Sequence, residues 1–356
     1  MITDDISGTS GNLNIRNSSS NGSLTLSGVN TYTGSTTIDS GATLALSGNG
    51  SIAESSALIN NGIFDITNTI NGATIKTLSG NGTVYTDLNK DLSLSNAAGT
   101  FAGVISGDGG LTILAGSETL TGSNSYTGST RIESGATMVL SGAGSIAGSN
   151  DVSNSGTLRV TGVTGNVSLG GSYSQSGGLI MNFSPTSNQQ IIINDTATLS
   201  GTLSIAAAPG TYNVGRYTLI TSNGVSGRFS SFDGSSLLSL SQDYSNYALG
   251  YDDKNVYLNL YPSLANTQAS ISASVTPLRN TFNQANTIIN NNLNLDCTVF
   301  DKYGICSSVV GSHTNIAGSK STEMSDGILV ISKNLTIISD WADLLTSQLI
   351  SQISRV

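Results

Sequence analysis

The 22 Asp and Glu side chains are the first candidates for chemistry, because polysaccharide cleavage uses clustered carboxylates. No two of them stand at i and i+2, the spacing that puts side chains on one face of a strand. Asp252 and Asp253 are adjacent, and adjacent strand residues point to opposite faces. Structural roles are therefore favoured over catalysis for the dispersed carboxylates: Asp39, Glu54, Asp65, Asp87, Asp91, Asp108, Glu118 and Glu133.

The sequence lacks the sets of residues that nucleophilic catalysis or metal binding would need. His313 is the only histidine, and we expect it at a strand end or in a loop rather than in a Ser-His-Asp triad. Calcium-binding glycine repeats occur as successive copies, so the single Gly-Asp-Gly-Gly at 107–110 predicts a turn. Cys297 and Cys306 are too few for a zinc site, and a loop disulfide is favoured over redox chemistry. We predict no catalytic, cofactor-binding or metal-binding residue.

Composition narrows the class of protein. The chain has 356 residues, 42 glycines, only 10% charged residues and a net charge of −9. It contains no basic cluster, which argues against nucleic acid as a partner. It contains neither a run of 18 apolar residues nor, in residues 1–20, a signal peptide. Apolar residues nevertheless recur throughout, so the chain is not a disordered Gly/Ser-rich linker.

The elements that would position these side chains are repeated. Residues 26–52 and 120–146 align with an offset of 94, and eight of their 27 positions differ. Within each copy apolar and small polar residues alternate over short segments, such as 42–46, and glycine interrupts them. Alternation predicts strands, and glycine predicts the turns between them.

Units that cannot bury their own apolar face must stack on near-copies of themselves. The sequence therefore predicts an all-β solenoid, a right-handed parallel β-helix with roughly 20–25 residues per coil. Small side chains suit its interior, because Ser, Thr and Asn can stack in hydrogen-bonded ladders from coil to coil.

The two strings NTYTGSTTIDSGATLALSGNGSI and NSYTGSTRIESGATMVLSGAGSI resemble the passenger-associated repeat of bacterial autotransporters. The pattern of that repeat is an aromatic-Thr-Gly-x-Thr start, an x-x-Gly-Ala/Thr-Leu middle and a Gly-x-Gly-Ser-Ile end. In that family the repeats are β-helical turns of an exported passenger. The resemblance implies a β-helical passenger over residues 1–165, with repeats at 26–52 and 120–146.

Residues 166–261 are similar to the autochaperone segment that ends such passengers. The similar strings are 210–220, 227–229 and 251–258. In the family this segment folds first and templates the rest during export. Its higher aromatic content also suits a cap, which the terminal coil of a solenoid needs.

Residues 262–296 contain no glycine, and we assign them to a linker with an α-helix. From Leu278 to Leu295, apolar residues recur at spacings of three and four, which indicates one helical stripe. The resemblance implies a helix that threads the pore of a membrane barrel. The alternative is a surface helix docked on the end of the solenoid.

Residues 297–356 resemble the start of the autotransporter barrel, at 300–309 and 327–332. Sixty residues are too few for eight strands of about ten residues, so we expect a truncated barrel-like segment. The pattern of residues 341–350 predicts an amphipathic helix. We expect the chain to be a fragment, truncated at its C-terminus and incomplete at its N-terminus.

The resemblance implies a surface-displayed or secreted passenger of a Gram-negative cell, an adhesin or surface structure without catalytic activity. Its partners would be the outer membrane, the barrel-assembly machinery and an unidentified surface ligand. One alternative is a β-helical polysaccharide-degrading enzyme, which three or more acidic and basic side chains on one face would favour. The other is a passive surface-layer protein, which would lack the linker helix.

Overall fold

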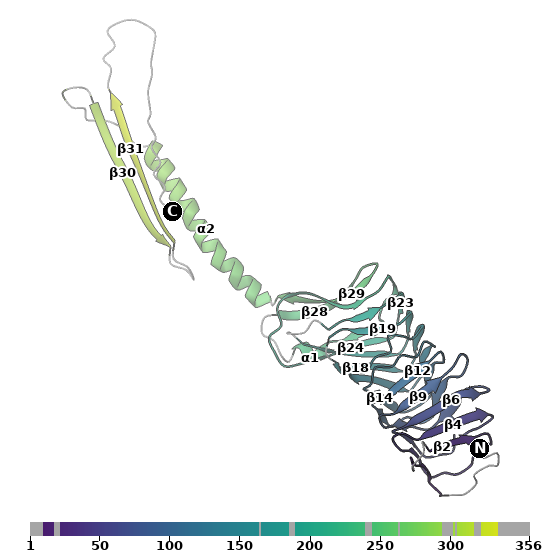
Figure 1. The fold of residues 1–356 in the computed structure, drawn as a ribbon. Coiled ribbons are helices and arrows are strands. Elements are labelled where there is room, and N and C mark those ends of the chain that lie inside the picture. Colours follow the sequence, from purple (N-terminus) through teal and green to yellow (C-terminus); the bar gives the residue numbers. More distant parts are fainter. Residues whose placement is uncertain are drawn as a thin grey trace. The chain divides into compact units, whose positions relative to one another are not determined.

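The computed structural model describes residues 10–17, 22–163, 165–184, 189–238, 244–262, 264–293, 302, 305–316 and 322–333. Two compact units divide the chain, Met1–Ser263 and Leu264–Val356. The first unit is a parallel β-solenoid, whose strands stack from β2 to β29 (Figure 1). The predicted parallel β-helix is confirmed.

The solenoid has three faces, and the chain crosses them in the order face one, face two, face three. Face one joins two sheets through a bridge between Gly80 and Phe101. Its strands are β1 (Leu13–Ile15), β3 (Thr36–Ile38), β5 (Leu58–Asn60), β8 (Leu78–Ser79), β11 (Thr100–Phe101), β14 (Ser117–Leu120), β16 (Thr137–Gly142), β18 (Thr157–Val163), β21 (Gly178–Phe183), β24 (Thr202–Ala207) and β27 (Ser231–Asp233).

Face two also joins two sheets, through bridges from Ser123 to Ser145 and from Ile146 to Leu169. Its strands are β2 (Ser23–Leu26), β4 (Thr43–Gly48), β6 (Ile63–Thr69), β9 (Thr83–Thr86), β12 (Val104–Gly107), β19 (Val167–Leu169), β22 (Ile191–Ile193), β25 (Gly215–Thr221), β29 (Asn255–Pro262) and β28 (Tyr244–Tyr251).

Face three is one continuous eight-stranded sheet. At its start, before the first regular strand, lies a bridge from Val29 to Ser51. Its strands are β7 (Ala73–Ile75), β10 (Leu92–Leu94), β13 (Leu111–Ile113), β15 (Thr130–Ile132), β17 (Asp151–Asn154), β20 (Ser172–Gln175), β23 (Thr196–Leu199) and β26 (Gly224–Gly227).

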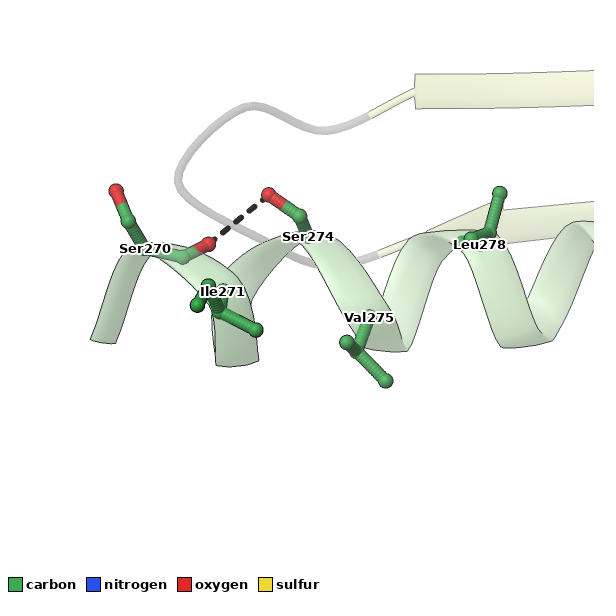
Figure 2. Close-up of a pocket in the computed structure, with 5 residues that line it drawn as sticks. All are labelled: Ser270, Ile271, Ser274, Val275 and Leu278. Carbon is green, nitrogen blue, oxygen red and sulfur yellow. Dashed lines mark hydrogen bonds between the residues drawn. The ribbon is translucent and has the colours of Figure 1, made fainter. Parts of the chain in front are cut away.

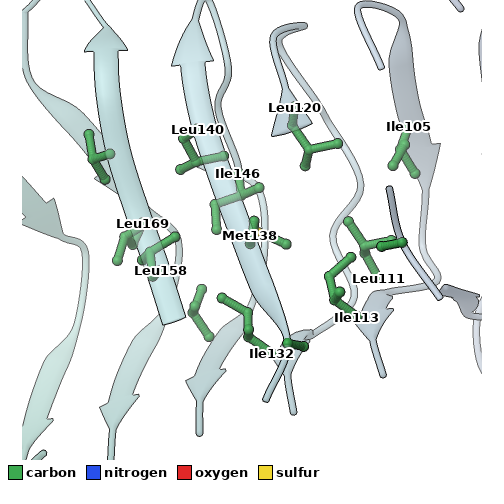
Figure 3. Close-up of a cluster of buried hydrophobic side chains, with 14 of the residues drawn as sticks. Ile105, Leu111, Ile113, Leu120, Ile132, Met138, Leu140, Ile146, Leu158 and Leu169 are labelled. Atoms are coloured by element: carbon green, nitrogen blue, oxygen red, sulfur yellow. The ribbon is translucent and has the colours of Figure 1, made fainter. Parts of the chain in front are cut away.

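The core is a set of ladders, because equivalent residues of successive coils lie in register. On face three Ile75, Leu94 and Ile113 pair in line, and all three are buried. Figure 3 shows part of this core, where the apolar side chains gather between the strands. Coil length varies: Leu92 pairs with Leu111, 19 residues on, whereas residue 197 pairs with 225, 28 residues on.

At its C-terminal end the solenoid changes from parallel to antiparallel pairing. β25 pairs antiparallel with β29, which pairs antiparallel with β28, and the short helix α1 (Ser235–Leu238) precedes β28. Aromatic rings pack here: Phe183 stacks on Tyr212 at 5.4 Å and meets Tyr217 edge-on at 5.2 Å. These large rings add buried apolar area to the core of the last coils, as the terminal part of a solenoid requires.

The second unit contains helix α2 (Leu264–Leu293) and an antiparallel pair, β30 (Ile305–Ile316) and β31 (Thr322–Lys333). The helix begins at Leu264, before the predicted apolar stripe, which starts at Leu278. No glycine interrupts the helix, and Pro277 lies inside it. Of the helices formed by the described residues, none has the length and hydropathy to span a membrane.

Both strands of this pair are longer than the predicted segments 300–309 and 327–332. His313 pairs with Ser325 inside β30, so its predicted place at a strand end or loop is wrong. The underestimate of strand length explains the error. Cys306 lies in β30, while Cys297 and the helix predicted at 341–350 lie outside the described residues. The predicted disulfide and the barrel-like segment both stay predictions.

Candidate functional site

The structure does not bring the dispersed carboxylates together. Among the described residues no group of three or more His, Cys, Asp or Glu side chains could hold a metal ion. In the described part of the chain two carboxylates make ion pairs, Glu54 with Lys76 at 3.7 Å and Asp87 with Lys90 at 2.8 Å. Asp108, in the predicted turn at 107–110, accepts a hydrogen bond from the Thr127 hydroxyl at 3.0 Å. These contacts fix local geometry.

The adjacent pair Asp252 and Asp253 lies in the turn between β28 and β29. Asp252 accepts hydrogen bonds from the backbone N–H groups of Lys254 and Asn255, at 2.9 and 2.8 Å, and from the Tyr257 hydroxyl. The hydrogen bond from Tyr257, together with these N–H donors, lowers the pKa of Asp252 to about 2. The carboxylate therefore stabilises the turn.

Glu118 is different, because it is buried inside face one. Its Oε2 accepts a hydrogen bond from the Gly99 N–H at 3.3 Å, and its Oε1 has no partner among the described residues. Burial raises the pKa of this carboxyl to about 8, so it is mostly protonated at neutral pH. The sequence carries a signal for this burial: Glu118 stands two residues before the inward-facing Leu120, on the same side of β14.

The repeat is built around a buried chain of hydroxyls. In the first copy the Tyr32 hydroxyl lies 2.6 Å from Thr36 Oγ1, which lies 2.9 Å from Ser55 Oγ of the next coil. The second copy has the same chain, with distances of 2.6 and 3.0 Å between the residues Tyr126, Thr130 and Ser149. Burial raises the pKa of both tyrosines.

A buried asparagine joins neighbouring coils in each copy. The Asn30 amide donates to the carbonyls of Gly28 and Ser51, at 3.0 and 2.9 Å. The Asn124 amide donates to the equivalent carbonyls of residues 122 and 145, both at 3.1 Å. Each buried polar group of these chains is satisfied, as a low-dielectric interior requires. The repeat residues thus act in the fold rather than in chemistry.

A surface hollow accompanies each copy. The first hollow, of about 450 Å³, lies between the turn at residues 48–51, residues 70–74 at the start of β7 one coil later, and Asp91 and Ser93 one coil further. The second hollow, of about 190 Å³, lies between the turn at residues 142–145 and residues 163 and 166–168. The 94-residue offset relates the two turns, so the repeat builds the same feature twice. Sequence reasoning missed both hollows.

Helix α2 carries a third, shallow hollow of about 280 Å³ (Figure 2). Ile271, Val275 and Leu278 line it and are between 52% and 72% exposed. In the same hollow the Ser274 hydroxyl donates to the Ser270 carbonyl at 2.9 Å. The helix therefore presents an apolar strip with no chemistry of its own.

Comparison with known proteins identifies the repeat. Residues 19–46 and 115–137 match the family model of the passenger-associated-transport-repeat, and both matches overlap the two copies described above. No curated protein and no solved structure matches the chain significantly.

The fold and the duplicated hydroxyl chains define a repeat-bearing β-solenoid. With the two family matches, the chain fits an autotransporter passenger that carries passenger-associated-transport-repeats. The resemblance seen in the sequence is confirmed at this level.

Proposed function

We propose that the solenoid is displayed at the outer membrane of a Gram-negative cell, or secreted from it, as an adhesin or surface structure. The observation that carries this proposal is the presence of two passenger repeats within one continuous parallel solenoid. A solenoid suits display because every coil is held by the coils on either side, which makes a long, stiff support.

The outward side chains of the solenoid support display without chemistry. They are mostly Ser, Thr and Asn, and the carboxylates among the described residues are dispersed. A polysaccharide-degrading role would need acidic and basic groups gathered on one face. We therefore propose a non-catalytic passenger.

The C-terminal part of the chain would serve export. The antiparallel strands and packed rings that end the solenoid are suited to an autochaperone, since they form a local core that earlier coils could stack upon. In this proposal α2 is the linker, β30 and β31 begin the translocating barrel, and the partners are the outer membrane and its barrel-assembly machinery.

Antibody labelling of intact cells tests the proposal. Antibodies raised against the purified chain should label intact cells that produce it, and added protease should remove the label while leaving a periplasmic control protein whole. Label that appears only after the cells are permeabilised, with none in the medium, would contradict display and secretion.

A further inference from the structure

We propose that the first hollow binds a neutral saccharide, an inference that deepens the proposed adhesin function and rests on it. The floor of this hollow is backbone that is already hydrogen-bonded: the Ile70 N–H donates to the Gly48 carbonyl at 2.9 Å, and the Ala73 N–H to the Asp91 carbonyl at 3.0 Å. Its shape is therefore held by the coil-to-coil ladder rather than by the side chains that line it.

The lining of the first hollow has hydrogen-bonding capacity that the fold does not use. The side chains of Asn49, Asn71, Thr74 and Ser93 have no hydrogen-bond partner among the described residues. By contrast, the buried Asn60 amide nitrogen donates to the Thr83 carbonyl at 2.8 Å, and the buried Asn124 amide donates to two carbonyls. Two free amides and two free hydroxyls around one hollow are suited to a ligand that both donates and accepts hydrogen bonds.

The charge of the lining selects against acidic ligands. Asp91 is its only charged side chain, and Asp91 Oδ1 accepts a hydrogen bond from the Gly110 N–H at 2.6 Å. The neighbouring Lys90 donates its hydrogen bonds to other groups, the Thr67 carbonyl and the Asp87 carboxylate. A phosphate or sugar acid would meet a carboxylate with no cation to balance it.

An apolar surface stands beside these polar groups. Ile70 lines the hollow and is 60% exposed, so a ligand can cover a branched apolar side chain there. A neutral sugar ring has both features, hydroxyls at its edge and a C–H surface on its face. The volume of about 450 Å³ falls in the range of small-molecule sites.

The second hollow supplies a matched control within the same chain. Ala143 takes the place of Asn49 there, and the Asn166 amide oxygen already accepts a hydrogen bond from the Gln190 N–H at 3.1 Å. This hollow is also less than half as large. It shares the turn of the first hollow but has alanine in place of the turn asparagine, so we expect saccharide at the first hollow only.

The test is a titration of the full 356-residue chain with cellotetraose, maltotetraose and mannotetraose, with tetragalacturonic acid as the acidic comparison. Calorimetry and saturation-transfer NMR should detect at least one neutral tetrasaccharide and no acidic one. The double variant Asn49→Ala/Asn71→Ala should weaken binding by about tenfold or more, because two hydrogen bonds are lost. The control Asn166→Ala should bind like the native chain, and all variants should unfold at the same denaturant concentration.

Three results would overturn the inference: no neutral tetrasaccharide binds, binding survives the double variant, or Asn166→Ala weakens it equally. Failure here leaves surface display intact, since the titration uses purified protein. Absence of label on intact cells and in the medium would refute display and secretion while leaving the titration result standing.

Discussion

The two copies of the repeat make the same bonds on different faces of the solenoid. In the first copy β3 lies on face one and β4 on face two, whereas in the second β15 lies on face three and β16 on face one. The tyrosine, threonine, serine and asparagine contacts are nonetheless the same to within 0.2 Å. The repeat thus specifies two strands and their corners but not the face on which they lie.

The length of chain between the copies sets this difference. From β3 the chain returns to face one four times, at β5, β8, β11 and β14, and β15 follows on face three. The 94-residue offset therefore covers four turns and two thirds of a fifth. The two hollows consequently lie at different corners, and one flat surface cannot meet both in the same way.

The largest effect should come from a glycine that the two copies share. A Cβ added at Gly50 would stand 2.2 Å from the Leu26 carbonyl oxygen, and one at Gly144 would stand 2.1 Å from that of Leu120. Gly50→Val and Gly144→Val should each lower the free energy of unfolding by about 4 kcal/mol, because backbone must move. Urea unfolding measures this, with Gly11→Ala, where space is open, as the control. A large loss of unfolding free energy in only one of the two variants would show that the two copies are not structurally equivalent.

Glu118 should show the next largest effect. It stands two residues before the second copy, whereas Leu24 stands at the equivalent place before the first. The pKa of the buried carboxyl, about 8, lies above its ordinary value of 4.5. The folded chain therefore binds more protons than the unfolded chain between these values, and its stability falls as pH rises through that window. The loss is at most about 4 kcal/mol from pH 5 to pH 9.

Unfolding of the Glu118→Gln variant over the same pH range checks this prediction. The variant should lose this part of the pH dependence, while the control Glu133→Gln, which changes an exposed carboxylate of the repeat, should keep it. An unchanged pH profile in Glu118→Gln would show that the carboxyl does not hold its proton in the fold.

The smallest effect should come from removing one hydroxyl from each copy. Tyr32→Phe and Tyr126→Phe each break a hydrogen bond to a buried threonine, which should lower the free energy of unfolding by about 1 kcal/mol. The two losses should be equal and additive, since the residues share no partner. Tyr85→Phe, at an exposed tyrosine, is the control. Denaturant unfolding of the two single variants, the double variant and the control measures these losses. Unequal losses in the two single variants would contradict the equivalence of the copies.

The sequence was sufficient to predict the strands and their stacking, because alternation such as Leu44 and Leu46 reports directly which side chains point inward. The face shift was not predictable, since coil length varies and a few added residues move a strand to the next face. The first hollow depends on how residues 70–74 of the next coil stack beside the turn at residues 48–51, which no local pattern encodes. The inward direction of Glu118 was readable from Leu120 and was overlooked.

Disulfide trapping tests the central claim, that the second copy stands on a different face. In a Cys297→Ser/Cys306→Ser background, Thr112→Cys with Arg131→Cys places two thiols on neighbouring strands in register, at a spacing a disulfide can bridge. Thr119→Cys with Arg131→Cys places them on different faces. We predict that mild oxidation links the first pair and leaves the second reduced. A bond in the second pair and none in the first would place both copies on one face and contradict the account.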